Sequence, residues 1–371
     1  MNEQATATAA GAALLVACAL WALAGCGAAT KPAQLNELGT RVAAGRDTHP
    51  TESGSHSAPA RAGLAAPYAI TAGADAVWFT EYGAAVVGEL APDGSLKRIA
   101  LEPGSIPERL TISRDGTLWF TDPEANRVGR LIPARHTLDY FEVPTAKSGP
   151  AGIATAPDGS IWFTEHAADQ VAVIVPPGEA GAAHARPGFR EFALPHGGGP
   201  AGIVATRDGD VWFAENSGNR IGRIVFLPGS KTPTISEYTL PVPSSSPNGL
   251  AVGGDGNVYF TELAASRIGK ITPAGQISEL VLPVNGAALD IAASPDGTIW
   301  TTVPRAHAIC RLQPGTQMIA YFLPDVTVPA FVAGGANGNL YFTEPSGKIA
   351  RFKPPGLLTE INVTQEGDAS R

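Results

Sequence analysis

Seven copies of a tetrapeptide related to Trp-Phe-Thr-Glu recur at nearly constant spacing along this 371-residue chain. Successive copies are 41, 43, 50, 47, 41 and 41 residues apart, and they begin at Trp78, Trp119, Trp162, Trp212, Tyr259, Trp300 and Tyr341. A period near 40 residues that is built from strand-type segments is typical of a β-propeller, in which each repeat forms one blade. We therefore predict an all-β fold, a seven-bladed β-propeller with four antiparallel strands per blade. Propellers host unrelated activities, so the fold alone does not give the function.

The fourth repeat shows how one blade is encoded. Short apolar or alternating segments at Pro200–Ala205, Val211–Glu215, Arg220–Ile224 and Ser236–Leu240 are separated by turn residues. Four such segments in succession predict an antiparallel meander of blade size. The chain begins its first repeat near Pro67 and ends its seventh near Val363, so the ring can close without an extra N-terminal strand, although residues 35–62 could still contribute one.

The turn between the first two strands of a repeat keeps its chemistry in repeats two to seven. It is Asp115-Gly116, Asp158-Gly159, Asp208-Gly209, Asp255-Gly256, Asp296-Gly297 and Asn337-Gly338. Asp-Gly and Asn-Gly favour the positive φ angles of tight hairpins. We interpret these acidic residues as turn formers and not as metal ligands.

The N-terminal segment predicts export. Residues 9–24 carry no charged side chain, and Leu23-Ala24-Gly25-Cys26 resembles a bacterial lipobox in which Cys26 is lipidated. We expect residues 1–26 to be a leader, 27–62 a flexible tether, 63–363 the propeller and 364–371 a disordered tail. A plain signal peptide or a membrane anchor is the alternative. The predicted location is extracytoplasmic, in the bacterial envelope, with membrane contact through the lipid anchor only, on the periplasmic side or at the cell surface.

The charge and the cysteine content of the chain exclude some classes of partner and bond. The formal net charge is −8 and no run of Lys and Arg occurs, whereas nucleic-acid binding requires a basic surface. Cys310 is the one cysteine of the predicted propeller, which rules out an intrachain disulfide there. We expect Cys310 to be a core residue, and the protein to act as a monomer.

The position three residues after each aromatic residue forms a predicted ring of carboxylates. In a four-stranded meander this position shares one face of the ring, the top face, with the start of each first strand. Its occupants are Glu81, Asp122, Glu165, Glu215, Glu262, Val303 and Glu344. Such a ring could hold a cation or an acid/base pair, and Glu344, Glu165 and Glu215 are the metal-ligand candidates. The alternative is structural, with each carboxylate paired to a nearby Arg such as Arg127, Arg220 or Arg267. Val303 breaks the ring, which suggests a pocket in that repeat.

A second ring is formed by the middle residue of Pro-x-Gly, where each first strand begins. Its occupants are Tyr68, Glu108, Ala151, Ala201, Asn248, Leu289 and Ala330. A crowded channel mouth favours small residues, so Tyr68, Glu108 and Asn248 are candidate ligand-binding residues. Arg109 and Asp290 join them, because they occupy the neighbouring Gly position. The alternative is the lining of a water-filled channel.

Histidine is sparse in the predicted top-face loops. His166 follows Glu165 directly and His196 precedes the next repeat, so Glu165, His166 and His196 could converge. His166 and His196 are the weak catalytic candidates, although exposed loop histidines are a commoner outcome.

The repeat Pro-x-Gly-Ile/Leu…Asp-Gly…Trp-Phe-Thr-Glu…Asn-Arg-Ile-Gly-Arg-Ile resembles that of the streptogramin lyase family over residues 62–363. The resemblance implies a seven-bladed propeller that linearises a cyclic depsipeptide antibiotic by elimination, of the virginiamycin B lyase type. It also implies a Mg²⁺ held by carboxylates and a histidine that moves the proton, placed at the x of Pro-x-Gly in late repeats.

Carried over residue by residue, the resemblance reaches only one member of that set. Glu344 matches a metal-binding carboxylate, because it lies fourteen residues after Ala330. The histidine positions hold Ala330 and Leu289, and the preceding glutamate position holds Val328. We therefore predict a propeller that binds a small molecule, a peptide or an envelope protein on its top face without streptogramin lyase chemistry. The alternatives are a metal-assisted lyase or lactonase-like hydrolase and an envelope scaffold.

Overall fold

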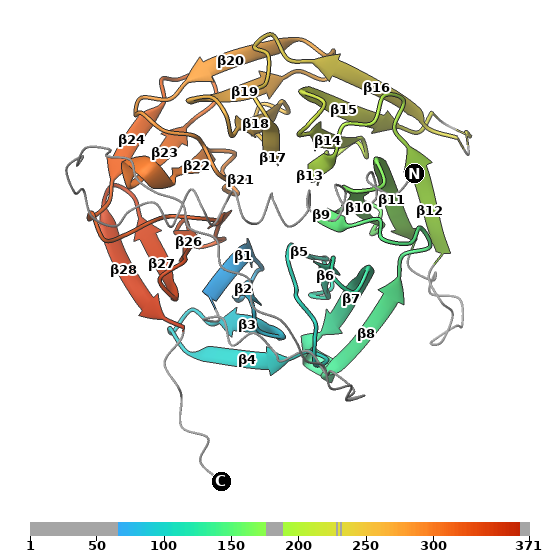
Figure 1. Ribbon diagram of the computed structural model, residues 1–371. Coiled ribbons are helices and arrows are strands. Elements are labelled where there is room, and N and C mark those ends of the chain that lie inside the picture. Colours follow the sequence, from blue (N-terminus) through green and yellow to red (C-terminus); the bar gives the residue numbers. More distant parts are fainter. Residues whose placement is uncertain (1–65, 176–187, 228, 231, 364–371) are drawn as a thin grey trace, which may run out of the picture.

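The protein is a ring of seven four-stranded antiparallel sheets, which confirms the predicted fold class (Figure 1). The computed structural model describes residues 66–175, 188–227, 229–230 and 232–363. The predicted leader with Cys26, the tether up to residue 62 and the tail 364–371 lie outside these residues. No helix within the described ranges is long and apolar enough to cross a membrane.

Each blade consists of four consecutive strands ordered from the axis to the rim. The innermost strands are β1 (Ala66–Ala72), β5 (Leu110–Ile112), β9 (Pro150–Thr155), β13 (Pro200–Ala205), β17 (Pro247–Val252), β21 (Ile291–Ala293) and β25 (Val332–Gly334). The second strands are β2 (Val77–Tyr82), β6 (Leu118–Asp122), β10 (Ile161–Glu165), β14 (Val211–Glu215), β18 (Val258–Glu262), β22 (Ile299–Val303) and β26 (Leu340–Glu344).

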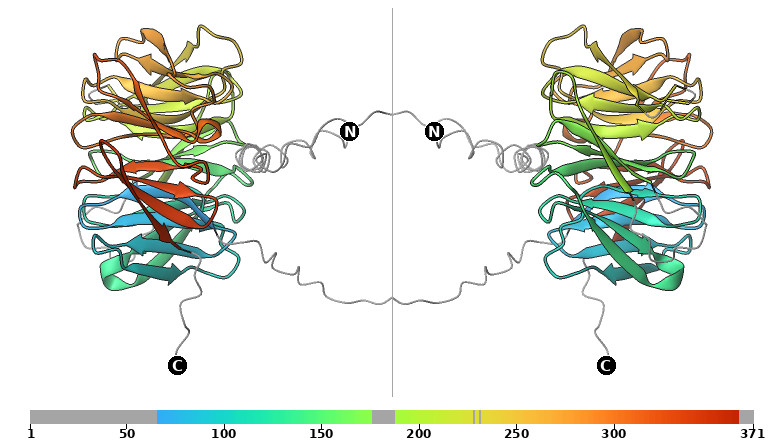
Figure 2. Two further views of the ribbon diagram at one scale, coloured as in Figure 1. Left: turned by 90° about the vertical axis from the view of Figure 1, so that its left-hand side faces the viewer. Right: turned by 90° about the vertical axis from the view of Figure 1, so that its right-hand side faces the viewer.

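The two outer positions complete each sheet. The third strands are β3 (Val86–Leu90), β7 (Arg127–Ile132), β11 (Gln170–Val175), β15 (Arg220–Val225), β19 (Arg267–Ile271), β23 (Ala308–Leu312) and β27 (Lys348–Lys353). The rim strands are β4 (Leu96–Ala100), β8 (Thr137–Glu142), β12 (Gly188–Ala193), β16 (Thr234–Thr239), β20 (Ile277–Val281), β24 (Ile319–Phe322) and β28 (Leu357–Asn362). Short 3-10 helices, η1 (Pro133–Arg135) and η2 (Pro304–Ala306), lie beside blades 2 and 6. Figure 2 shows the same ring edge-on.

The tetrapeptide supplies the core on both faces of each second strand. In blade 4, Trp212 and Phe213 are both almost fully buried, and they point to opposite faces because side chains alternate along a strand. Phe213 lies directly across from Gly222 on β15, and a Cβ added to Gly222 would stand 2.0 Å from the ring. The glycine of the third strand is therefore required by the phenylalanine of the second.

A threonine of the second strand links neighbouring blades. Thr164 Oγ1 accepts from the Gly152 N–H at 2.8 Å and donates to the Ala201 carbonyl of the next blade at 2.7 Å. The same donation from Thr343 to the Tyr68 carbonyl, at 2.7 Å, joins blade 7 to blade 1. Within the described residues every sheet contains only consecutive strands, so blade 1 takes its four strands from one stretch of chain, as expected. Residues 35–62, which could add a strand, lie outside the described residues.

The starts of the inner strands divide the ring into two unequal sectors. In blades 3 and 4 the backbones meet so closely that a Cβ on Gly152 would stand 2.2 Å from the Ala201 carbonyl oxygen. In blades 2, 6 and 7 that glycine is replaced by Arg109, Asp290 and Phe331, and the inner strands shorten to three residues. Large side chains therefore enter the axis from this second sector.

Candidate functional site

Four side chains meet where the inner strands of blades 6, 7, 1 and 2 begin. Tyr68 and Phe331 have ring centroids 4.3 Å apart, and the Arg109 guanidinium carbon lies 4.2 Å from the Phe331 centroid. Arg109 Nη1 also lies 3.5 Å from Asp290 Oδ1, so a side chain of blade 2 reaches one of blade 6. We name Tyr68, Arg109, Asp290 and Phe331 the axial cluster. The structure thus brings together three of the five predicted ligand-binding residues.

The charged side chains of the axial cluster, Asp290 and Arg109, are largely shielded from solvent. Burial raises the pKa of Asp290 above its usual range, although Arg109 opposes this, and the Val332 N–H donates to Asp290 Oδ2 at 3.0 Å. Burial alone would lower the pKa of Arg109, but Asp290, Tyr68 and Glu108 outweigh it and raise it. Burial raises the pKa of Tyr68 further above its usual range, so its hydroxyl stays protonated and can donate a hydrogen bond.

Glu108 borders this cluster, and Asn248 stands apart from it. Burial raises the pKa of Glu108, Arg109 opposes this and Glu124 adds to it. The Glu108 carbonyl accepts from Thr80 Oγ1 at 3.0 Å, which fixes its backbone against blade 1. Asn248 is half-buried at the start of β17 in blade 5. Its carbonyl lies 2.1 Å from a Cβ built on Gly202, so its backbone belongs to the tightly packed sector.

The predicted carboxylate ring consists of buried groups, and three of them, Glu81, Asp122 and Glu215, accept hydrogen bonds from an arginine of their own blade. All six carboxylates have no exposed surface. Asp122 accepts from Arg127 Nε at 2.9 Å and from Ser105 Oγ at 2.7 Å, and Glu81 accepts from Arg98 Nε at 2.8 Å. These pairings support the structural interpretation of the ring. Arg220 likewise bonds Glu215 through Nε at 2.7 Å, whereas Arg267 bonds the rim residue Glu279.

The metal-ligand candidates Glu344, Glu165 and Glu215 lie in three different blades and do not form one site. Among the described residues, no group of three or more His, Cys, Asp and Glu side chains is placed to hold a metal ion. Both oxygens of Glu344 are buried without a hydrogen-bond partner, but Ala330 beside this strand and Leu289 at the equivalent position of blade 6 offer no ligand. The residues present therefore do not fit the Mg²⁺ that the family resemblance implies.

Burial raises the pKa of several buried glutamates to near 7. Burial raises the pKa of Glu344 to about 7, with Glu360 adding to the shift and Lys348 opposing it. Burial likewise raises the pKa of Glu215 to about 7, while its hydrogen bond from Arg220 opposes the shift. These values follow from the enclosure of a carboxylate between two sheets.

The candidate histidines face different partners. His166 Nδ1 lies 3.2 Å from the Pro200 carbonyl oxygen, and burial lowers the pKa of its ring. His196 is largely exposed, and its Nδ1 lies 2.5 Å from Glu237 Oε2 on β16. Neither histidine contacts Glu165 in a hydrogen bond, so the predicted convergence of Glu165, His166 and His196 is not formed.

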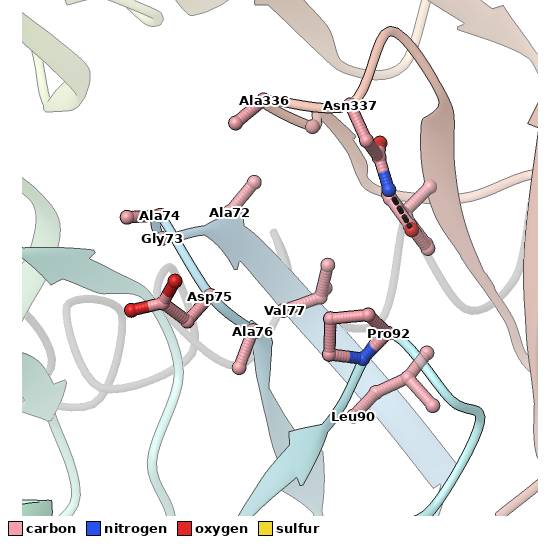
Figure 3. Close-up of a pocket in the computed structure, with 12 residues that line it drawn as sticks. Ala72, Gly73, Ala74, Asp75, Ala76, Val77, Leu90, Pro92, Ala336 and Asn337 are labelled. Atoms are coloured by element: carbon pink, nitrogen blue, oxygen red, sulfur yellow. Dashed lines mark hydrogen bonds between the residues drawn. The ribbon is translucent and has the colours of Figure 1, made fainter.

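Two surface depressions lie away from the axial cluster. One of about 130 Å³ is lined by the first turn of blade 1 and by Gly335–Asn337 of blade 7, on the face opposite the top (Figure 3). Asp75 is its one charged lining residue, and Asn337 Nδ2 bonds the Tyr341 hydroxyl at 3.1 Å. The other, of about 410 Å³, is lined by Leu282–Asn285, Ala306 and Phe322 beside Val303, where the carboxylate ring is interrupted.

Phe331 was missed by the sequence reasoning. It occupies the same Gly position that singled out Arg109 and Asp290, so the same rule applied to repeat seven would have found it. The inter-blade role of Thr80, Thr164 and Thr343 was also missed. Its signal was the recurrence of threonine before the acidic residue in most repeats.

Comparisons with known proteins identify a family and solved structures of the same fold. The profile of the virginiamycin B lyase family matches residues 54–224 and 177–370. A virginiamycin B lyase from Nocardia farcinica is 37% identical over 91 residues, which are 24% of this chain and 32% of that protein. The match therefore spans about a third of the length of this curated relative.

Solved structures resemble the whole propeller. A streptogramin B lyase superposes with a TM-score of 0.71 and 30% identity, covering 81% of this chain and 95% of the other. A catalytically inactive histidine-to-alanine variant of virginiamycin B lyase from Staphylococcus aureus, solved with quinupristin, gives 0.70 and 30%, covering 78% and 96%.

Proposed function

The chain belongs to the virginiamycin B lyase family, and from this premise we propose that it binds a cyclic depsipeptide at the axial cluster without cleaving it. The protein is exported and held in the bacterial envelope by a lipid on Cys26. The family name implies a lyase, whereas we propose that this chain has kept the ligand-binding surface and lost the catalytic activity.

The observation that carries the proposal is the axial cluster itself. Arg109, Asp290 and Phe331 replace the glycine that blades 3 and 4 need for close packing, and together with Tyr68 they gather at one side of the axis. A stack of Tyr68, Phe331 and Arg109 is larger than ring closure requires. Arg109 is the partly exposed member of the cluster, and a guanidinium backed by buried aromatic rings is typical of ligand-binding sites.

A cyclic depsipeptide suits this chemistry. Its carbonyl groups are acceptors, and Arg109 presents a fork of N–H donors of which Nη1 contacts Asp290. Tyr68 and Phe331 are only 8% and 3% exposed, so they would form the apolar floor beneath the ligand, and Arg109 would be the group that contacts it. The catalytically inactive relative was solved with quinupristin, which supports the idea that such a propeller can hold this ligand without turning it over.

The loss of chemistry is argued from the residues that replace the implied base. Ala330 and Leu289 are buried apolar residues, and no side chain at these positions can accept a proton. Removing a general base from a proton transfer typically costs about 10²–10⁴-fold in rate. The competing function is metal-assisted lyase activity at a site around Glu344. An experiment must distinguish it from binding alone.

Calorimetric titration of the full chain with quinupristin tests the binding. We expect saturable binding that weakens at least about tenfold in Arg109→Ala, since a hydrogen bond from a charged group is worth about 1.5–3 kcal/mol. Arg311→Ala is the matched control, because Arg311 stacks on Trp300 in blade 6 and lies outside the axial cluster. Absence of heat, or equal weakening by both substitutions, would refute the proposed site.

Membrane attachment has a separate test. Cys26→Ser should move the protein from the membrane fraction to the soluble fraction of the producing cells, because the lipidated thiol is lost. Persistence of the variant in the membrane fraction would refute lipid anchoring and leave the binding proposal untouched.

A further inference from the structure

We propose that blade 3 contains a calcium-binding site between Glu165 and Glu191, at a place where other blades carry a positively charged side chain. The site lies within one sheet, away from the axial cluster, and it is independent of the proposed depsipeptide binding. It follows from comparing equivalent positions around the ring.

Strand register places three side chains of each blade on one sheet face. In blade 3, Glu165 pairs with Gln170 on β11, and Glu191 on β12 pairs with Ala172, two residues further along β11. Because residues two apart on a strand share a face, Glu165, Gln170 and Glu191 point the same way.

In blades 4, 5 and 7 the equivalent middle residue is a cation, which contacts both glutamates in blade 4 and only the outer glutamate in blades 5 and 7. Arg220 lies between Glu215 and Glu237, with Nε 2.7 Å from the first carboxylate and 3.5 Å from the second. The corresponding contacts to the outer glutamate are 3.1 Å from Arg267 to Glu279 and 2.6 Å from Lys348 to Glu360. Blade 3 keeps both glutamates but has Gln170 in place of the cation.

The inner glutamate of blade 3 has no positively charged side chain at the middle position. Glu165 has no exposed surface, and neither of its oxygens has a hydrogen-bond partner; the same holds for Glu262 and Glu344, but their blades carry Arg267 and Lys348 where blade 3 has Gln170. The nearby Ser148 hydroxyl is engaged with Asn126 Oδ1 at 3.2 Å. An enclosed carboxylate without a partner is costly, so a ligand that supplies positive charge here would stabilise the fold.

The surrounding groups are oxygen donors of a kind that suits calcium. Thr145 bonds both oxygens of Glu191, through its N–H at 3.0 Å and its hydroxyl at 3.1 Å, and its hydroxyl lies 3.3 Å from Gln170 Oε1. Glu165, Glu191 and Gln170 thus supply carboxylate and amide oxygens, and the two carboxylates balance a divalent charge. Ca²⁺ accepts six to eight oxygens in irregular geometry, whereas Mg²⁺ demands a regular octahedron. Glu191 and Gln170 are only half-buried, so an ion can reach the site.

The test is calcium uptake by the full chain after treatment with a chelator. Equilibrium dialysis with Ca²⁺ alone should show a bound ion that is lost in Glu165→Gln. Thermal unfolding should shift upward by about 5 °C when Ca²⁺ exceeds its dissociation constant about 100-fold. Mg²⁺ at the same concentration should give a smaller shift.

The ring itself offers matched variants. Gln170→Arg copies blade 4, so it should remove both the uptake and the calcium-dependent shift while leaving the chelator-treated protein at least as stable as the parent. Arg220→Gln copies blade 3, and it should lower stability in chelator and add a second calcium-dependent shift. If Gln170→Arg does not fold, Glu165→Gln and Glu191→Gln carry the test. Lack of calcium uptake by the parent chain, or uptake unchanged in these variants, would overturn the proposal.

Discussion

Replacing the buried carboxylate of Glu344 by an amide should stabilise the propeller in alkaline solution and leave it unchanged in acid. Glu344 has no exposed surface, and neither oxygen is hydrogen-bonded. Burial raises its pKa from an ordinary 4.5 to about 7, with Glu360 adding to the effect. The folded state therefore favours the protonated, neutral side chain.

The sign of the pH dependence follows from this difference. Because the pKa is higher in the folded than in the unfolded chain, the contribution of Glu344 is fully present below about pH 4.5. It is lost as the pH rises through about 7. The difference corresponds to about 3 kcal/mol, and relaxation of the surrounding protein around the buried charge reduces it to about 2 kcal/mol. At about 2 °C per kcal/mol for a domain of this size, Glu344→Gln should raise Tm by about 4 °C at pH 8.5.

Calorimetric unfolding at pH 5 and pH 8.5 measures this effect. Glu81→Gln is the control, because Glu81 accepts two hydrogen bonds from Arg98 and its replacement should lower Tm at pH 8.5. An equal gain for Glu344→Gln at both pH values, or a loss at pH 8.5, would refute the account of the buried carboxylates.

Three further changes test the packing of the ring by thermal unfolding or chemical labelling. Thr343→Val removes the hydrogen bond that joins blade 7 to blade 1 and should cost about 1–3 kcal/mol, whereas Thr316→Val in an exposed turn should cost little; equal effects would contradict the proposed link. Gly202→Ala places a Cβ 2.1 Å from a carbonyl oxygen and should lower Tm by several degrees, while Gly188→Ala, with open space around it, should be tolerated; a tolerated Gly202→Ala would count against close packing there. Cys310 is fully buried and burial raises its pKa to about 12, so an alkylating reagent should label it only after unfolding; rapid labelling of the native protein would show that β23 is accessible.

Most of the fold could be predicted from the repeat pattern. In repeat four, the predicted segments at Pro200–Ala205 and Val211–Glu215 coincide with β13 and β14, because Pro-x-Gly and Asp-Gly mark the strand ends. The rim strand begins two residues earlier and ends one residue earlier than predicted, at Thr234–Thr239, since its alternation is weaker than the core pattern. The burial of Cys310 was also confirmed.

The sequence analysis did not decide whether the carboxylates of the ring are buried or exposed, although the alternation of side chains along the strand predicts it. Glu81 lies two residues after Phe79 and so shares the face that packs between blades. Its burial and its pairing with Arg98 follow from that position. The sequence could not show that Glu344 lacks such a partner, because this depends on where the Lys348 side chain goes.

The axial cluster could be predicted only in part. Position alone marked Tyr68, Arg109 and Asp290 as unusual, but contact between blades 2 and 6 depends on the reach of one arginine past two other blades. Pairs separated by 181 residues in the chain leave no local pattern. Phe331, which fills the space between them, completes the cluster through packing.

The central claim is that this propeller retains a ligand surface without the family's chemistry. Its most direct test is mass spectrometry of quinupristin recovered after equilibrium dialysis against the full chain in the presence of Mg²⁺. We predict that the peptide concentrates on the protein side and returns with an unbroken ring. Recovery of linearised peptide, or equal amounts on both sides of the membrane, would contradict the account.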